Sequence, residues 1–117
     1  MTATETALTQ VCPADAIDPE SAVTALVHGV AVAVFRTKDD RYYALDNYDP
    51  FGRASVLSRG IVGTRLVGDR EVPFVASPLH KQAFDLRSGR CLDDDEVSVP
   101  TYDVVVSNGM VLVGEQH

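Results

Sequence analysis

Short apolar runs alternate with polar turn residues along most of the chain. The runs are rich in valine and other residues favoured in strands, and Gly, Asn, Asp or Ser residues separate them. They predict strands at residues 23–26, 30–36, 42–45, 61–67, 72–76, 82–86, 102–106 and 110–113. The one candidate helix is about a single turn at 13–17, too short to be stable alone. Short strands at this spacing predict an all-β fold, either a sandwich or a small barrel.

Turn residues between the runs predict how neighbouring strands pair. His28-Gly29 and Asn108-Gly109 are each flanked by apolar runs, which is the pattern of a two-residue hairpin. We therefore expect residues 23–45 to form a three-stranded meander. Val30–Phe35 and Val104–Val106 are continuously apolar rather than alternating. Such runs predict strands that are buried on both faces.

Composition narrows the class of protein without indicating its chemistry. A chain of 117 residues suits one domain with its own core. With 10 Lys and Arg against 17 Asp and Glu, the net charge is −7. Phosphate backbones and anionic lipid headgroups would repel such a chain, so we expect neither nucleic acid nor membrane as a partner. No apolar run approaches the roughly 20 residues of a membrane span.

The N-terminal residues indicate where the folded domain begins and in which cellular compartment the protein is expected. Residues 1–7 are mostly small and polar, which predicts a flexible N-terminus ahead of a domain at 8–114. They lack the basic flank and apolar stretch of an export signal, so the cytoplasm is the expected location. There Cys12 and Cys91 are expected to stay reduced and to pack as small hydrophobic residues.

Two loops are the candidate functional regions. Residues 46–60 form the longer one and residues 77–81 the shorter, and each follows a predicted strand. Loops held on a rigid β scaffold are where binding and catalytic residues are most often found. Because no Gly-rich phosphate loop and no Gly-x-Ser-x-Gly motif accompany them, we expect no dinucleotide site and no serine nucleophile in this chain.

The amino-acid sequences of these two loops resemble those of the cluster-binding loops in Rieske-type [2Fe–2S] domains. The segment from Ser77 to Gly89, SPLHKQAFDLRSG, resembles the second cluster loop of that family, C-P-x-H-G-x-x-F-D-x-x-[ST]-G. The triplet Asp49-Pro50-Phe51 resembles the C-P-H of its first loop. The resemblance implies a Rieske-like β-sandwich with two hairpin loops in a small subdomain of about residues 46–90.

Only one of the four ligand positions implied by the resemblance keeps its ligand. His80 is retained, whereas Asp49, Phe51 and Ser77 replace a cysteine, a histidine and a cysteine. A Rieske centre requires two thiolates on one iron and two imidazoles on the other. A serine hydroxyl keeps its proton near neutral pH, a carboxylate is a hard ligand, and a phenyl ring has no lone pair to donate. We expect no [2Fe–2S] cluster, no other metal and no catalytic residue here.

Each degenerate position also has a structural interpretation. Asp49 is expected to brace its own loop through the following backbone amides. Phe51 is expected either to fill the space of a cluster or to lie exposed as an interface anchor, and filling is favoured. A mononuclear metal site from Asp49, Ser77 and His80 is the alternative, but it lacks a convincing third ligand.

A longer pattern resembles one clusterless family, the small subunit of assimilatory NAD(P)H-dependent nitrite reductase. The matching segments are Asn47, Asp49–Phe51, Ser55–Gly60 and Ala76–Gln82, read as N-x-D-P-F, S-V-L-S-R-G and A-S-P-L-H-K-Q. The resemblance implies a large-subunit partner that carries FAD, siroheme and a [4Fe–4S] cluster and reduces nitrite to ammonia. It implies that this chain binds no cofactor itself.

Basic residues at the two loops are candidates for docking that partner. Arg53 and Arg59 lie in the first loop, and Lys81 and Arg87 lie in or after the second. They form either an ordinary solvated surface or a cationic rim suited to an acidic patch. Two other classes of function stay open: a free-standing Rieske-type electron-transfer ferredoxin with an atypical centre, and a standalone ligand-binding or regulatory domain.

Overall fold

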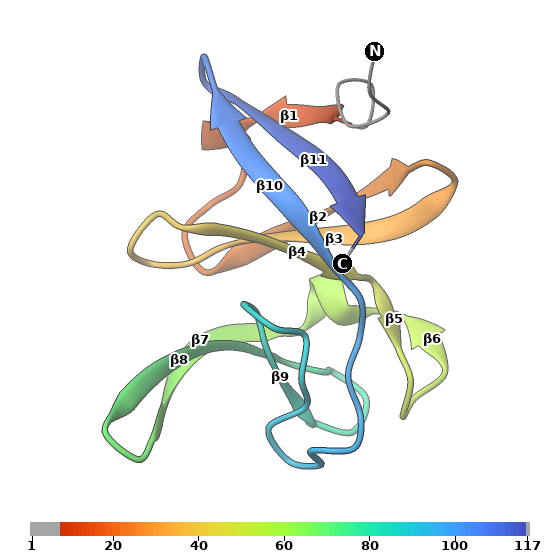
Figure 1. Ribbon diagram of the computed structural model, residues 1–117, viewed down its shortest axis with the longest axis vertical. Coiled ribbons are helices and arrows are strands. Elements are labelled where there is room, and N and C mark those ends of the chain that lie inside the picture. The colour runs from red at the N-terminus through yellow and green to blue at the C-terminus, as the bar shows by residue number, and fades with distance from the viewer. Residues whose placement is uncertain (1–7, 117) are drawn as a thin grey trace.

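A computed structural model describes residues 8–116, which form an almost entirely β structure in two lobes (Figure 1). The strands are β1 (Thr9–Pro13), β2 (Ser21–Val27), β3 (Val30–Arg36), β4 (Tyr42–Asp46), β5 (Tyr48–Asp49), β6 (Ala54–Ser55), β7 (Ile61–Val67), β8 (Arg70–Ala76), β9 (Ala83–Asp85), β10 (Thr101–Ser107) and β11 (Met110–Gln116). Two single 3₁₀ turns, η1 (Ala14–Ala16) and η2 (Leu57–Arg59), complete the elements. The segment 1–7, expected to be flexible, lies outside the described residues.

The larger lobe is an antiparallel sheet of six strands in the order β1-β11-β10-β4-β3-β2. The smaller lobe comprises the sheet β7-β8-β9 and the short pair β5-β6, and it is inserted between β4 and β10. Every predicted strand is present, and residues 23–45 form the expected meander. No helix between residues 8 and 116 has the length and hydrophobicity to cross a membrane.

Two hairpins have the turn geometry that their residues predict. His28 and Gly29 have φ of 51° and 81°, and Asn108 and Gly109 have φ of 52° and 77°. Each pair is the two-residue loop between paired strands. Positive φ at both turn residues matches the right-handed twist of the flanking strands, which is why Asn-Gly is such a strong hairpin signal.

Strand β3 is buried on both faces from Val32 to Phe35, as its continuous apolar run predicts, whereas Val30 at its start is 40% exposed. Val32 and Val34 point into a cluster within the larger lobe, with Ile17, Ala44, Val111 and Val113. Ala33 and Phe35 point into a second cluster between the lobes, with Leu45, Leu57, Val75, Phe84 and Leu86. The alternation of a strand thus sends successive side chains of β3 into two different cores.

The expectation that a continuous apolar run is buried on both faces is wrong for Val104–Val106. Val105 and Val106 are 45% and 44% exposed. Strand β10 pairs with β4 only at Thr101 and Tyr102, so the rest of β10 extends past the end of β4 and pairs with β11 alone (Figure 1). A continuous apolar run therefore does not guarantee two covering layers when the partner strand is short.

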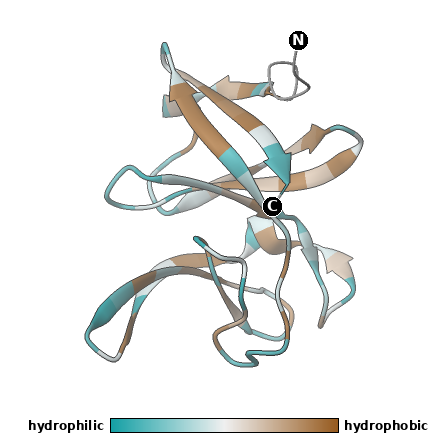
Figure 2. Ribbon diagram, viewed as in Figure 1, coloured by the Kyte–Doolittle hydropathy of each residue, from teal (hydrophilic) through white to brown (hydrophobic). Residues whose placement is uncertain are grey.

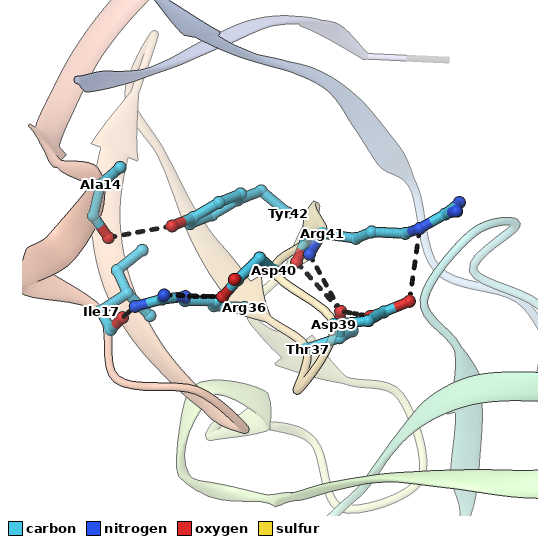
Figure 3. A network of polar contacts seen from close by, with 8 residues as sticks. All are labelled: Ala14, Ile17, Arg36, Thr37, Asp39, Asp40, Arg41 and Tyr42. Carbon is cyan, nitrogen blue, oxygen red and sulfur yellow. Dashed lines mark hydrogen bonds and ion pairs between the residues drawn. The ribbon is translucent and has the colours of Figure 1, made fainter.

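A polar network ties the N-terminal part of the larger lobe to the β3–β4 turn (Figure 3). Arg36 Nη1 donates to the Ile17 carbonyl at 2.7 Å, and its Nη2 pairs with Asp40 at 2.6 Å. The Tyr42 hydroxyl donates to the Ala14 carbonyl at 3.1 Å. Because these contacts satisfy carbonyls around η1, they hold residues 14–17 against the sheet.

Candidate functional site

The two candidate loops lie against each other in the smaller lobe. We call residues 46–60 and 77–81 the paired loops. The Ser77 hydroxyl donates to Asp49 Oδ2, which joins the two loops directly. A side chain at Gly52 would collide with Leu79 Cδ1 and approach Asp49 Oδ2 to 3.0 Å. The absence of a side chain at Gly52 therefore permits this close approach.

Asp49 and Ser77 form the buried centre of the paired loops. Asp49 is fully buried and Ser77 is 1% exposed. Asp49 Oδ1 accepts the backbone N–H of Phe51 at 2.9 Å, the brace expected of an Asx residue before a turn. Ser77 Oγ also accepts the N–H of Leu79 at 3.2 Å. The two residues thus hold both loops as well as each other.

Asn47 fixes the far end of the first loop. Its Oδ1 accepts the Ser58 N–H at 2.7 Å, and its carbonyl accepts the Leu57 N–H at 3.0 Å. The Ser58 hydroxyl in turn accepts a hydrogen bond from Thr24 of β2 at 2.6 Å. The turn η2 is therefore held on the larger lobe, which makes the first loop a rigid connection rather than a free one.

The remaining two ligand positions differ in exposure. Phe51 is half-buried and packs against the core between the lobes, with its ring centroid 6.1 Å from that of Phe84. His80 is exposed. The phenyl ring therefore takes part in core packing, while the imidazole faces solvent.

The donor set of the paired loops does not fit a [2Fe–2S] centre. Both cysteine positions hold oxygen ligands that are hydrogen-bonded to each other, and one histidine position holds a phenyl ring. Thiolates are the ligands that an iron–sulfur cluster requires at such positions. Across residues 8–116, no three His, Cys, Asp or Glu side chains are grouped so that they could hold a metal ion.

The direct link between Asp49 and Ser77 is a contact that was not predicted from the sequence. A signal for it was available, because the two thiolates of a Rieske centre bind the same iron and their positions must therefore be adjacent. Complementary hydrogen-bonding residues at both positions point to a mutual contact.

The four basic docking candidates do not lie together. Arg53 and Lys81 are exposed on the paired loops, and Arg59 is exposed at the end of η2. Arg87 follows β9, which runs away from Lys81, and it lines two cavities elsewhere. The structure therefore places Arg53 and Lys81 on the two loops that contact each other, and Arg87 at the cavities elsewhere.

Arg53 and Lys81 share an unusual backbone conformation. Their φ values are 56° and 64°, in the left-handed region that favours glycine. Lys81 stands where the Rieske pattern C-P-x-H-G has glycine. A side chain in this region costs about 1–2 kcal/mol relative to the right-handed conformation. The chain therefore carries two exposed cations at positions where glycine would be less strained.

The cysteines do not belong to this site. Cys91 is buried in the core between the lobes, as expected, whereas Cys12 is only half-buried at the edge of the other core. Burial raises the pKa of both thiols, so the unreactive protonated form is favoured at neutral pH.

Comparisons with known proteins agree with this geometry. The family model of the Rieske-like [2Fe-2S] domain matches residues 7–114. The nitrite reductase (NADH) small subunit of Salmonella typhimurium is 43% identical over 102 residues, which cover 86% of this chain and 91% of that protein. The nitrite reductase [NAD(P)H] large subunit of Klebsiella oxytoca is 42% identical over 106 residues, which cover 91% of this chain but 11% of that protein.

A solved structure extends the similarity to the fold. A protein from Mycobacterium tuberculosis, assigned as an NADH-dependent nitrite reductase small subunit, has a TM-score of 0.85 and 44% identity. The alignment covers 92% of this chain and 94% of the other. The chain therefore belongs to the Rieske-like [2Fe-2S] domain family and, within it, to the small subunits of NAD(P)H-dependent nitrite reductase.

Proposed function

We propose that this chain is a non-catalytic subunit that binds no [2Fe–2S] cluster and docks onto the nitrite reductase large subunit through the paired loops. The observation that carries the proposal is the buried contact between Asp49 and Ser77, which joins the two loops where cluster thiolates would stand. FAD, siroheme and a [4Fe–4S] cluster are assigned to the large subunit, which reduces nitrite to ammonia in nitrate assimilation in the cytoplasm.

Freshly isolated protein is expected to be colourless and to contain no stoichiometric iron or acid-labile sulfide. The physical reason is that oxygen and phenyl groups replace three of the four ligands. Visible absorption and iron and sulfide analysis of the purified chain check this, with a Rieske ferredoxin purified in parallel as the control. Stoichiometric sulfide would support the free-standing ferredoxin instead.

The Klebsiella oxytoca protein supports association with a large subunit. A region similar to 91% of this chain is part of that single large-subunit polypeptide. Two domains joined in one protein are at high effective concentration, which favours their contact. A separate chain of the same family would need a docking surface to achieve the same proximity.

The paired loops supply such a surface. Arg53 and Lys81 are exposed, and Leu79 between the loops is 47% exposed. Strained residues persist where the side chain has a role that outweighs the backbone cost. Two cations beside an exposed apolar side chain suit a partner with an acidic rim and an apolar centre.

The double variant Arg53→Glu/Lys81→Glu is expected to weaken binding of the large subunit by about 10- to 100-fold, because two attractive contacts become repulsive. Copurification and titration of the two subunits measure the effect. A complex of unchanged affinity would show that the paired loops are the wrong surface.

Glycine at the same positions distinguishes docking from folding. Arg53→Gly/Lys81→Gly removes both cations but relieves the backbone strain, so the variant is expected to be at least as stable as the parent while it binds more weakly. His28→Gly is the matched control, because His28 also has positive φ and is exposed, but lies on the larger lobe. It should leave binding unchanged.

A further inference from the structure

A second charged surface lies away from the paired loops. A cavity of about 590 Å³ is lined by Arg70, Arg87 and Arg90, by Ser88 and Ser98, and by an apolar wall that includes Val72. Arg70 begins β8, and Ser77 follows the end of that strand. At about 3.3 Å per residue, the two ends of β8 are about 20 Å apart, so this cavity and the Asp49–Ser77 contact are separate sites.

A neighbouring cavity of about 360 Å³ shares Arg87 and is also lined by Lys38 and Arg41. We call the residues that line the two cavities the basic groove. Five of the ten Lys and Arg of the chain lie there, and the carboxylates that line it within the described part of the chain are Asp39, Glu71 and Asp85. Figure 2 shows the hydrophilic colour at the outer end of the β7–β8 hairpin, where Arg70 lies. The groove is thus locally positive on a chain of net charge −7.

Three cations of the groove, Lys38, Arg70 and Arg90, form no ion pair within residues 8–116, and neither does one carboxylate, Glu71. Among residues 8–116, Asp85 is the one carboxylate that lines the larger cavity, and it is paired with Arg87 at 3.1 Å. Neither Arg70 nor Arg90 forms an ion pair with any residue in the range 8–116. Two guanidinium groups are therefore available for an anionic partner.

Arg87 is held in a fixed orientation between the two cavities. Asp85 accepts hydrogen bonds from Arg87 Nε at 3.2 Å, from Nη2 at 3.1 Å and from its backbone N–H at 2.8 Å. The turn beneath is also fixed, because Gly89 has φ of 77° and a side chain there would collide with the Val99 carbonyl. The ordered Arg87 therefore fixes the shape of the groove between its two cavities, while the cations available to a partner lie on either side of it.

We infer that the basic groove binds an acidic segment of the nitrite reductase large subunit, as a second contact beside the paired loops. This inference rests on the proposed function. An extended segment can reach both cavities, and its carboxylates complement the unpaired arginines. A small anion fits less well, because Arg70, Ser88, Arg90 and Ser98 are all exposed, whereas small-molecule sites bury most of their ligand. The net charge of the whole chain disfavours nucleic acid.

The test is Arg70→Gln/Arg90→Gln in the full chain, titrated with the large subunit at low and at high salt. We expect about tenfold weaker binding at low salt and a smaller difference at high salt, since salt screens exposed charges. Gln10→Glu/Ser107→Glu is the matched control. It changes the net charge by the same amount at exposed positions of the larger lobe, and it should bind as the parent does.

Each outcome of these titrations either supports the inference or contradicts it. Parent-like affinity of Arg70→Gln/Arg90→Gln overturns it, and if Arg53→Glu/Lys81→Glu still weakens binding, the proposed function stands. Absence of binding by the parent chain overturns both. Citrate, used as a free small-anion probe, is expected to shift the amide resonances of the groove only at millimolar concentration. Tight saturable binding of citrate would identify a small-anion site instead.

Discussion

Asp49→Ala is expected to lower the free energy of unfolding by about 3 kcal/mol, since it leaves one buried and one part-buried donor without an acceptor. Those donors are the Ser77 hydroxyl and the Phe51 N–H, both bonded to the Asp49 carboxyl group. An unpaired buried polar group costs about 1–3 kcal/mol, and small domains have only about 5–15 kcal/mol in total. Urea unfolding followed by circular dichroism measures the change.

Two further variants distinguish the effect of losing the hydrogen bonds on stability from the effect of losing a charge. Asp49→Asn keeps the shape and one acceptor, so it should lose less stability than Asp49→Ala. Asp69→Ala removes a carboxylate from an exposed turn and should change stability by no more than about 0.5 kcal/mol. If Asp49→Ala is as stable as Asp69→Ala, then the contact between the paired loops does not hold them together.

Asp49→Cys/Phe51→His/Ser77→Cys is expected to acquire a [2Fe–2S] centre that the parent lacks. Together with His80, these three substitutions restore the complete ligand pattern, C-x-H in the first loop and C-x-x-H in the second. The loops already lie together, because Asp49 and Ser77 are in direct contact. Anaerobic reconstitution with ferrous iron and sulfide, followed by visible spectroscopy and metal analysis, measures the gain.

Matched variants make this result interpretable. Asp49→Cys/Ser77→Cys without the histidine supplies thiolates alone, and Phe51→His supplies an imidazole alone, so neither should show the Rieske spectrum. Circular dichroism verifies that each variant is folded. A folded triple variant that takes up no iron would mean that the loops have changed in shape as well as in ligands.

Strand positions were predictable because they depend on local patterns. Apolar runs, Gly-containing turns and the Asn108-Gly109 hairpin depend on the preferences of a few consecutive residues. The short strands β1, β5 and β6 were missed because strands β5 and β6 have only two residues each and β1 has no alternating pattern. Burial was predictable for β3 but not for β10, because burial depends on how far the neighbouring strand extends.

The candidate site likewise has some features that the sequence predicts and others that only the fold decides. That Asp49, Phe51 and Ser77 do not match the thiolate and imidazole donors of a Rieske centre follows from the chemistry of their side chains, which no fold alters. Other features depend on the packing of distant segments. These are the contact between Asp49 and Ser77, the strained backbones of Arg53 and Lys81, and the position of Arg87 beside Arg70 and Arg90.

By itself, then, the amino-acid sequence determined the positions of eight apolar strands, the family and the departures from the Rieske ligand pattern, since each depends on residue type and local spacing. Only the tertiary structure decided which cations share a surface. Residues 28 positions apart, such as Asp49 and Ser77, meet because the core between the lobes brings their loops together, whereas Lys81 and Arg87, six positions apart, are separated by β9.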